Sequence, residues 1–161
     1  MCSKSRVVLR PIQSSDLEGI VTLFKETVHH VNAKDYTSEQ LLVWAPHHIH
    51  YNDERWQSLL HNIAYLAEID KVIVGFADMT TEGYLDRLYV HKDYQGQGIA
   101  SQLVKKLESF LFGGDVKKIT TEASITAKPF FERMGYFVVK EQNKSVQGVT
   151  LVNFVMEKRL G

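Results

Sequence analysis

Hydrophobic and polar positions follow two spacings along this chain, and each spacing predicts one kind of element. The run RVVLRP reads as a short strand that Pro11 ends. From there to about residue 60, apolar side chains recur every three or four positions, which predicts helices. Three helix starts are expected: a capping box of Ser15 with Glu18, a second at Thr37, and a cap at Asn52.

The pattern changes to strands after Asn62. Three runs rich in β-branched and aromatic residues, IAYLAEID, KVIVGFADMT and YLDRLYVH, predict an antiparallel meander. Helical spacing returns over residues 99–111, and VKKITTEAS follows as a strand. The chain then predicts a short helix in TAKPFFERM and two strands, Tyr136 to Asn143 and Val149 to Lys158, that turn near Gly148.

These elements predict an α/β (α+β) protein with a mixed, mostly antiparallel central sheet of about seven strands, flanked by helices. A chain of 161 residues with 44% hydrophobic residues is long enough to close one core. No Pro/Gly/Ser-rich linker divides it. We therefore expect one domain over residues 1–161.

Charge and composition exclude several classes of partner. The 19 basic residues balance 19 acidic ones, so no overall field attracts nucleic acid or an anionic membrane. Cys2 is the one cysteine and cannot form an internal disulfide, and the N-terminus lacks the apolar segment of a secretory signal, so we expect a cytoplasmic protein. The seven histidines have no supporting cysteine or clustered acid, so no metal site is expected.

The segment HKDYQGQGIASQL places two glycines directly before the predicted helix. Bare backbone at a helix N-terminus suits an anion such as a pyrophosphate, because the first N–H groups lack partners within the helix. Gly96 and Gly98 would allow phosphate oxygens to approach, and Gln95 and Gln97 could donate hydrogen bonds. Ser101 occupies the third glycine position of a dinucleotide fingerprint, which argues against that fold.

Two segments carry a resemblance to a known family. LYVHKDYQGQGIASQLVKKLE is similar to the acetyl-CoA-binding signature of the GCN5-related N-acetyltransferases (GNAT), and ASITAKPFFERMGYFVV is similar to the family's next element. The resemblance, to a small bacterial-type member, implies a splay between the fourth and fifth strands and acetyl-CoA as the acetyl donor. The cofactor-binding residues that it implies are Leu88, Tyr89, Val90, Gln95, Gly96, Gln97, Gly98, Ile99, Ala100, Ser101, Ser124 and Phe131.

The resemblance further implies direct transfer of an acetyl group to a primary amine in a ternary complex. The Val90 amide would then hydrogen-bond the thioester carbonyl. Many family members have a tyrosine where this chain has Phe131, and that hydroxyl protonates the departing thiolate; here a water or a nearby phenol, Tyr136 or Tyr89, could substitute. Two alternatives stay open, a module that binds CoA or an acyl-CoA without turnover, and O-acetyl or other acyl transfer on the same fold.

An amine needs a base, because its pKa near 10.4 leaves it almost wholly protonated at neutral pH. Strand alternation predicts that Asp86 shares a face with Leu88 and Val90, which makes Asp86 a candidate base. Glu122 is the second candidate, although either carboxylate could instead form a structural ion pair.

The acceptor side is less well defined by the sequence. Tyr36 and Trp44, in the helices before the meander, are candidates for lining the acceptor pocket or for packing in the core. The acceptor itself is a small-molecule or peptide amine that the residues do not name. The two C-terminal strands could also pair across a homodimer.

Overall fold

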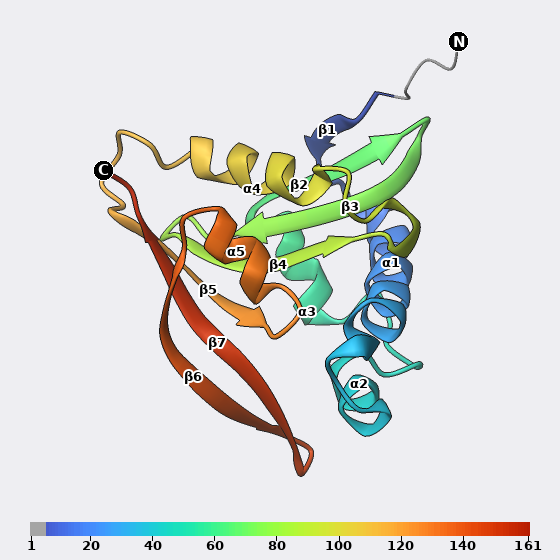
Figure 1. Cartoon of the computed structure of the whole chain (residues 1–161). Coiled ribbons are helices and arrows are strands. Elements are labelled where there is room, and N and C mark those ends of the chain that lie inside the picture. The colour runs from blue at the N-terminus through green and yellow to red at the C-terminus, as the bar shows by residue number, and fades with distance from the viewer. Residues whose placement is uncertain (1–5) are drawn as a thin grey trace.

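The computed structural model describes residues 6–161; Cys2 lies outside them. Seven strands form one sheet in the order β1-β2-β3-β4-β5-β7-β6 (Figure 1). The strands are β1 (Val8–Pro11), β2 (Ile63–Ile69), β3 (Val72–Met79), β4 (Tyr84–Val90), β5 (Lys118–Ser124), β6 (Phe137–Val146) and β7 (Val149–Arg159). The helices are α1 (Leu17–His30), α2 (Ser38–Trp44), α3 (Glu54–Gln57), α4 (Ile99–Ser109) and α5 (Lys128–Arg133).

All neighbouring strands are antiparallel except β4 and β5, which are parallel. These two pair only at Tyr84 with Thr120 and at Leu85 with Thr121, where the Thr121 hydroxyl also donates to the Leu85 carbonyl at 2.8 Å. Beyond Leu85 the strands separate. The predicted mixed α/β sheet with a splay between the fourth and fifth strands is therefore confirmed.

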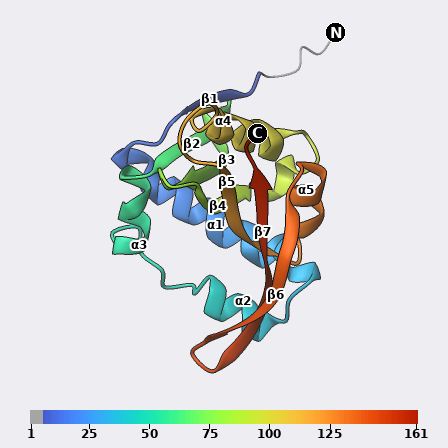
Figure 2. The same cartoon turned by 90° about the vertical axis from the view of Figure 1, so that its left-hand side faces the viewer.

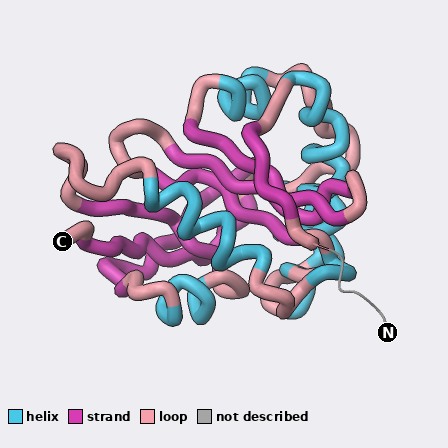
Figure 3. The backbone as a smooth tube through the Cα atoms, turned by 90° about the horizontal axis from the view of Figure 1, so that it is seen from above, coloured by secondary structure: helices cyan, strands magenta, loops and turns pink. Residues whose placement is uncertain are grey.

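Helices pack on both faces of the sheet (Figure 3). On one face, α4 and α5 contribute buried side chains such as Leu103 and Phe131 to a core cluster with β2 to β5 and β7. On the other face, α1, α2 and α3 contribute side chains such as Phe24, Leu41 and Trp56 to a second cluster. The splay is thus an opening between two packed layers.

The helix starts agree in part with the sequence analysis. The capping box of Thr37 with Gln40 is confirmed, because each residue accepts a hydrogen bond from the other's backbone N–H. The capping box expected at Ser15 is wrong. The box is instead made by Gln13 and Asp16, and the Asp16 carboxylate also binds Arg10.

The cap of the third helix is also one residue away from its expected place. Asp53, not Asn52, precedes α3, which runs for four residues and continues as a 3₁₀ turn over Ser58–Leu60. An element this short is not stable by itself, and the packing of Trp56, which is 1% exposed, holds it in position.

The last two strands form a long hairpin that projects beyond the rest of the sheet (Figure 2). Its turn at Gln147 and Gly148 has positive φ at both residues. Strand β6 is the edge of the sheet, and Phe137, Val138 and Val139 are exposed on it. The homodimer expected through these strands stays a prediction.

Two further properties concern residues 6–161. No helix in this part of the chain is long and apolar enough to cross a membrane. No three His, Cys, Asp or Glu side chains there are grouped so that they could hold a metal ion.

Candidate functional site

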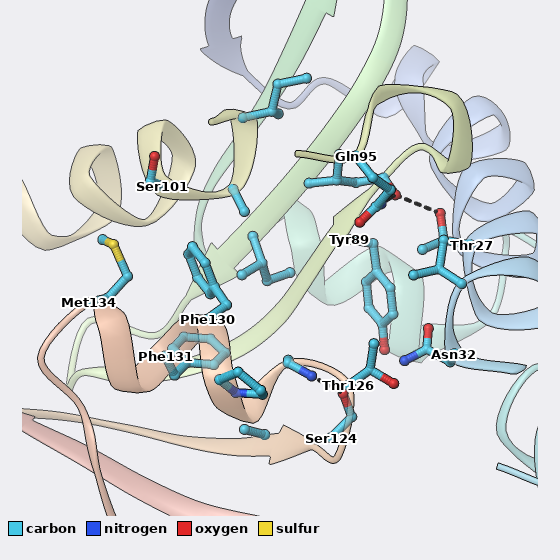
Figure 4. A pocket seen from close by; sticks show the side chains of 18 of the residues that line it. Thr27, Asn32, Tyr89, Gln95, Ser101, Ser124, Thr126, Phe130, Phe131 and Met134 are labelled. Atoms are coloured by element: carbon cyan, nitrogen blue, oxygen red, sulfur yellow. Dashed lines mark hydrogen bonds between the residues drawn. The ribbon is translucent and has the colours of Figure 1, made fainter. Parts of the chain in front are cut away.

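A cavity of about 720 Å³ opens where β4 and β5 separate. Its walls come from α1, α2, β4, β5, α5 and the loop that leads into α4. Figure 4 shows Phe130, Phe131 and Met134 on one side of the cavity and Thr27 and Asn32 on the opposite side. The cavity therefore has an apolar wall near α5 and a polar wall near α1.

The glycine loop forms one end of the cavity. Gly96 has a φ of +73° and Gly98 a φ of +80°, and Gly98 is the N-cap of α4. A Cβ on Gly96 would meet nothing within 4 Å, and one on Gly98 would meet only the Ser101 hydroxyl at 3.8 Å. This left-handed conformation favours glycine at both positions. Because the space around them is open, the first N–H groups of α4 are accessible to an anion.

The predicted loop residues do not all lie on the cavity. Gly96, Gly98, Ile99, Ala100 and Ser101 line it, whereas Gln97 is exposed and lies outside its walls. The carboxamide of Gln95 is at the cavity, but it donates hydrogen bonds to the carbonyls of Val90 (2.6 Å) and His91 (3.3 Å). In this structure Gln95 therefore ties the loop to the end of β4 rather than presenting a free donor.

The main chain of β4 faces the cavity at two residues. The pairing of β3 with β4 and the bond from His91 N to the Val74 carbonyl place Leu88 and Val90 in the positions whose N–H and C=O groups point away from β3. Strand β5 pairs with neither residue. Their N–H groups thus face the splay, which is the arrangement expected for Val90.

Asp86 is the extra residue of a β-bulge. Asp78 pairs with Arg87 and Met79 pairs with Leu85, so no residue of β3 lies opposite Asp86. Strict alternation therefore fails, and Leu85 rather than Asp86 packs in the same cluster as Leu88 and Val90. The expectation that Asp86 shares their face is wrong, because the bulge turns its carboxylate toward Arg87, 3.5 Å from Nη2.

Asp86 and Glu122 both line the cavity but differ in environment. Burial raises the pKa of Asp86, against the lowering effect of Arg87. Burial acts on Glu122 in the same direction, but hydrogen bonds from Lys144 and Gln142 outweigh it and lower the pKa of Glu122. Asp86 is therefore the better proton acceptor of the two, and Glu122 is the one already paired.

The two aromatic residues that were candidates for the acceptor pocket, Trp44 and Tyr36, lie in different places in the structure. Trp44 lines the cavity and donates from Nε1 to the Tyr89 hydroxyl at 3.2 Å. Tyr36 contacts Trp44 edge to face but lies outside the cavity walls. Its hydroxyl donates to the Val152 carbonyl (2.7 Å) and accepts from Ile125 N (2.9 Å), so it joins the end of β5 to β7. Its ring is buried in the core, which is the second of the two roles that the sequence left open.

The two phenols that could take the role of the family tyrosine, Tyr136 and Tyr89, also lie in different environments. Phe131 lines the cavity, and the Tyr136 ring packs against it edge to face. The Tyr136 hydroxyl, however, donates to the buried Glu108 at 2.9 Å and lies outside the cavity walls. Tyr89 does line the cavity, and burial raises its pKa to about 12, so its phenol is protonated at neutral pH.

The polar side of the cavity combines one predicted residue with several that the sequence did not predict. The hydroxyl of Ser124, the predicted one, accepts a hydrogen bond from Ala127 N at 3.0 Å. Thr27, Asn32 and Thr126 complete the polar wall, and Thr27 donates to the Val90 carbonyl at 3.1 Å. Thr27 stands within the apolar stripe of α1, and a polar residue on such a stripe is the signal that could have identified it.

Comparison with known proteins agrees with this geometry. Residues 32–158 match the model of the acetyltransferase (GNAT) domain, which shows that the chain belongs to the GNAT family. The chain is 32% identical over 153 residues to the uncharacterised N-acetyltransferase YafP of Escherichia coli K12, covering 94% of this chain and 95% of YafP. Family membership supports acetyl-CoA-dependent acetyl transfer.

Solved structures show the same fold. A GCN5-related N-acetyltransferase from Rhodopseudomonas palustris, also described as a class-II aminotransferase, superposes with a TM-score of 0.88 at 30% identity over 99% of both chains. The PaiA N-acetyltransferase from Thermoplasma acidophilum, solved with coenzyme A, has a TM-score of 0.75 at 18% identity, over 96% of this chain and 99% of PaiA.

Proposed function

We propose that this protein transfers an acetyl group from acetyl-CoA directly to a primary amine, with both substrates bound together. The observation that carries the proposal is that the cavity at the splay combines the open glycine loop, the free N–H groups of β4 and the carboxylate of Asp86. A site for a phosphate-bearing donor and a proton acceptor thus share one cavity.

The residues present fit acetyl-CoA. Gly96 and Gly98 would hold its pyrophosphate at the N-terminus of α4, because a Cβ at either position would project into open space. The N–H groups of Leu88 and Val90 would bind its pantetheine arm and thioester carbonyl. When bound, acetyl-CoA supplies the activated acetyl group. Ser124 and Phe131 would line the path of the arm.

Asp86 is proposed to take the proton from the amine. Its raised pKa brings it closer to neutral pH than an ordinary aspartate, and its side chain is 41% exposed, so an amine or an intervening water can reach it. Glu122 is less suited because Lys144 and Gln142 already occupy its oxygens. Its proposed role is to hold β5 to the hairpin.

The second candidate function is a module that binds CoA or an acyl-CoA without turnover. Phe131 favours it, since this side chain lines the cavity and has no proton to donate to a thiolate. Under the main proposal, the phenol of Tyr89, on β4 at the wall of the same cavity, supplies that proton. Turnover distinguishes the two functions.

The experiment is a calorimetric titration with acetyl-CoA followed by thiol release across a panel of amines and alcohols. We expect saturable binding and thiol release with one class of amine. Binding without release on any acceptor would favour the non-catalytic module, and release on an alcohol would indicate O-acetylation. Absence of binding would contradict the whole proposal.

Replacing Asp86 with Asn tests the base. We expect kcat to fall roughly 10²- to 10³-fold and the acidic limb of the pH profile to disappear, with unchanged CoA affinity. Asp115→Asn, at an exposed position after α4, is the matched control and should leave all three quantities unchanged. An acidic limb that survives in Asp86→Asn would contradict the role of Asp86.

A further inference from the structure

A buried ion pair lies directly behind the bulge. Asp78 is 0% exposed and Arg87 is 8% exposed. The guanidinium binds the carboxylate with two hydrogen bonds, Nε to Oδ1 at 2.9 Å and Nη2 to Oδ2 at 2.7 Å. Neither residue lines the cavity, and no step of the proposed reaction uses either one.

The pair is held from several elements. Arg87 also donates to the Arg55 carbonyl (2.5 Å) and to the Ser58 hydroxyl (2.8 Å), so β4 is joined to α3 and the turn that follows it. Asn62 donates to Asp78 Oδ2 at 2.8 Å. These five hydrogen bonds join four elements of the fold and its loops, so the guanidinium is held in one orientation.

This orientation brings Arg87 Nη2 within 3.5 Å of the Asp86 carboxylate. The two residues are adjacent in the chain, and the bulge that displaces Asp86 lies between the pairs made by Arg87 and Leu85. We propose that Arg87 and Asp78 are positioning residues for Asp86: Arg87 fixes its carboxylate at the cavity wall, and Asp78 offsets the charge of Arg87. This inference rests on the proposed function.

The offset matters because a lone arginine at this distance would hold an aspartate ionised to low pH. Such a carboxylate would be a weak base. With Asp78 bound to two of its nitrogens, the guanidinium can orient Asp86 without strongly suppressing its basicity. The pKa directions agree, because burial raises the pKa of Asp86, Arg87 lowers it and Asp78 raises it.

Other charged and titratable groups face Asp86 from the elements around it. They are Tyr84, Arg87 and Tyr89 on β4, Asp78 on β3, Glu122 on β5, Lys144 on β6 and Arg55 on α3. Among the charged groups, Arg87 and Asp78 have the two largest effects on the pKa of Asp86, and these effects are opposite in sign. Changing them one after the other should therefore move the pKa in opposite directions.

The test measures the acidic limb of the kcat/KM profile, the pH range in which activity falls because the base is protonated, in two variants. Asp78→Asn removes the group that raises the pKa of Asp86, so the limb should move down by roughly half to one pH unit. Asp78→Asn/Arg87→Gln also removes the larger lowering effect, so the limb should move up from its position in the wild type. The double variant leaves no unpaired buried charge, and it decides the question if Asp78→Asn alone does not fold.

Arg10→Gln/Asp16→Asn is the matched control. This pair also has two hydrogen bonds, from Nη1 and Nη2 at 2.9 Å each, but belongs to β1 and the turn before α1. Its loss should lower the melting temperature and leave the limb in place. A limb that also stays in place in both Asp78 variants would overturn the inference and leave the pair a structural one.

The two proposals fail in different ways. If Asp86→Asn keeps the acidic limb, the base itself is misassigned and the proposed function is wrong in that respect. If Asp86→Asn loses the limb but the Asp78 variants do not shift it, Asp86 is the base and only the positioning role of Arg87 and Asp78 is contradicted.

Discussion

The two ends of the cavity are built in different ways. The donor end comes mainly from one continuous segment, residues 88–101, with Ser124 and Phe131 added from β5 and α5, and it acts mainly through main-chain groups and glycine conformation. The base end is assembled from side chains on β3, β4, β5, β6 and α3 that meet around Asp86. One end is therefore local in sequence, and the other exists only in the folded protein.

This difference predicts different responses to substitution. A main-chain site has no side chain to remove, so it is vulnerable only at residues whose conformation no other amino acid adopts easily. A site made of side chains can be altered one charge at a time, and its effects should appear in pH dependence before they appear in folding. Three pairs of variants test this division, from the largest expected effect to the smallest.

The largest effect is expected at Gly98. Gly98→Val should weaken acetyl-CoA binding on the order of 100-fold, because a β-branched residue strains the left-handed conformation and its side chain enters the space left for the anion. Calorimetric titration measures this. Gly148, in the β6–β7 turn, has the same φ of +80° and equally open surroundings.

Gly148→Val is therefore a control for strain alone. It should lower the melting temperature about as much as Gly98→Val while leaving acetyl-CoA affinity unchanged. Equal loss of affinity in both variants would show that strain, and not the anion site, explains the effect at Gly98.

The local character of the donor end explains why the sequence predicts it well. The spacing of Gly96 and Gly98 before an apolar helical stripe is enough to place a helix N-terminus, and the structure has α4 beginning at Ile99. The meander and the hairpin could also be predicted from the sequence, because β-rich runs separated by turn residues pair with their neighbours in the chain.

The base end could not be predicted in the same way. The bulge at Asp86 depends on how β4 pairs with β3, and the two successive polar residues between Leu85 and Leu88 do not by themselves show where the extra residue lies. The use of the Tyr36 hydroxyl between Ile125 and Val152 depends on contacts 89 and 116 residues away in the chain. Residue type identified these groups as polar, but only the fold decides which surface they serve.

A smaller effect is expected at the two phenols. Tyr89→Phe should lower kcat about 10-fold, less than is usual for proton transfer because a thiolate is a tolerable leaving group. Tyr136→Phe should leave kcat unchanged, because its hydroxyl serves Glu108 outside the cavity. It should instead cost about 1 kcal/mol of stability, since Glu108 keeps its contact with Lys158.

Steady-state rates and urea unfolding measure the pair side by side. Phe131→Tyr in the Tyr89→Phe background sharpens the result, because it places a phenol on the opposite wall of the same cavity and should restore part of kcat. A fall in kcat in Tyr136→Phe that matches the fall in Tyr89→Phe would contradict the assignment of the proton donor to Tyr89.

The smallest effect concerns stability at the base end, where two isosteric changes should have opposite signs. The folded-state pKa of Asp86 is raised, so its ionised form disfavours the folded protein once the pH exceeds the pKa of the unfolded chain, and Asp86→Asn should raise the melting temperature at pH 7. The folded-state pKa of Glu122 is lowered, so its stabilisation is present above the unfolded pKa and is lost as the pH falls through the folded value.

Glu122→Gln should therefore lower the melting temperature at pH 7, by an amount that corresponds to less than about 1 kcal/mol because Lys144 is largely exposed. The difference between Glu122→Gln and the wild type should vanish in acid, where Glu122 is protonated in both states. Scanning calorimetry at pH 7 and at pH 3 measures both variants. Changes of the same sign at pH 7 would mean that the two carboxylates play equivalent roles and that Asp86 is held no differently from a structural acid.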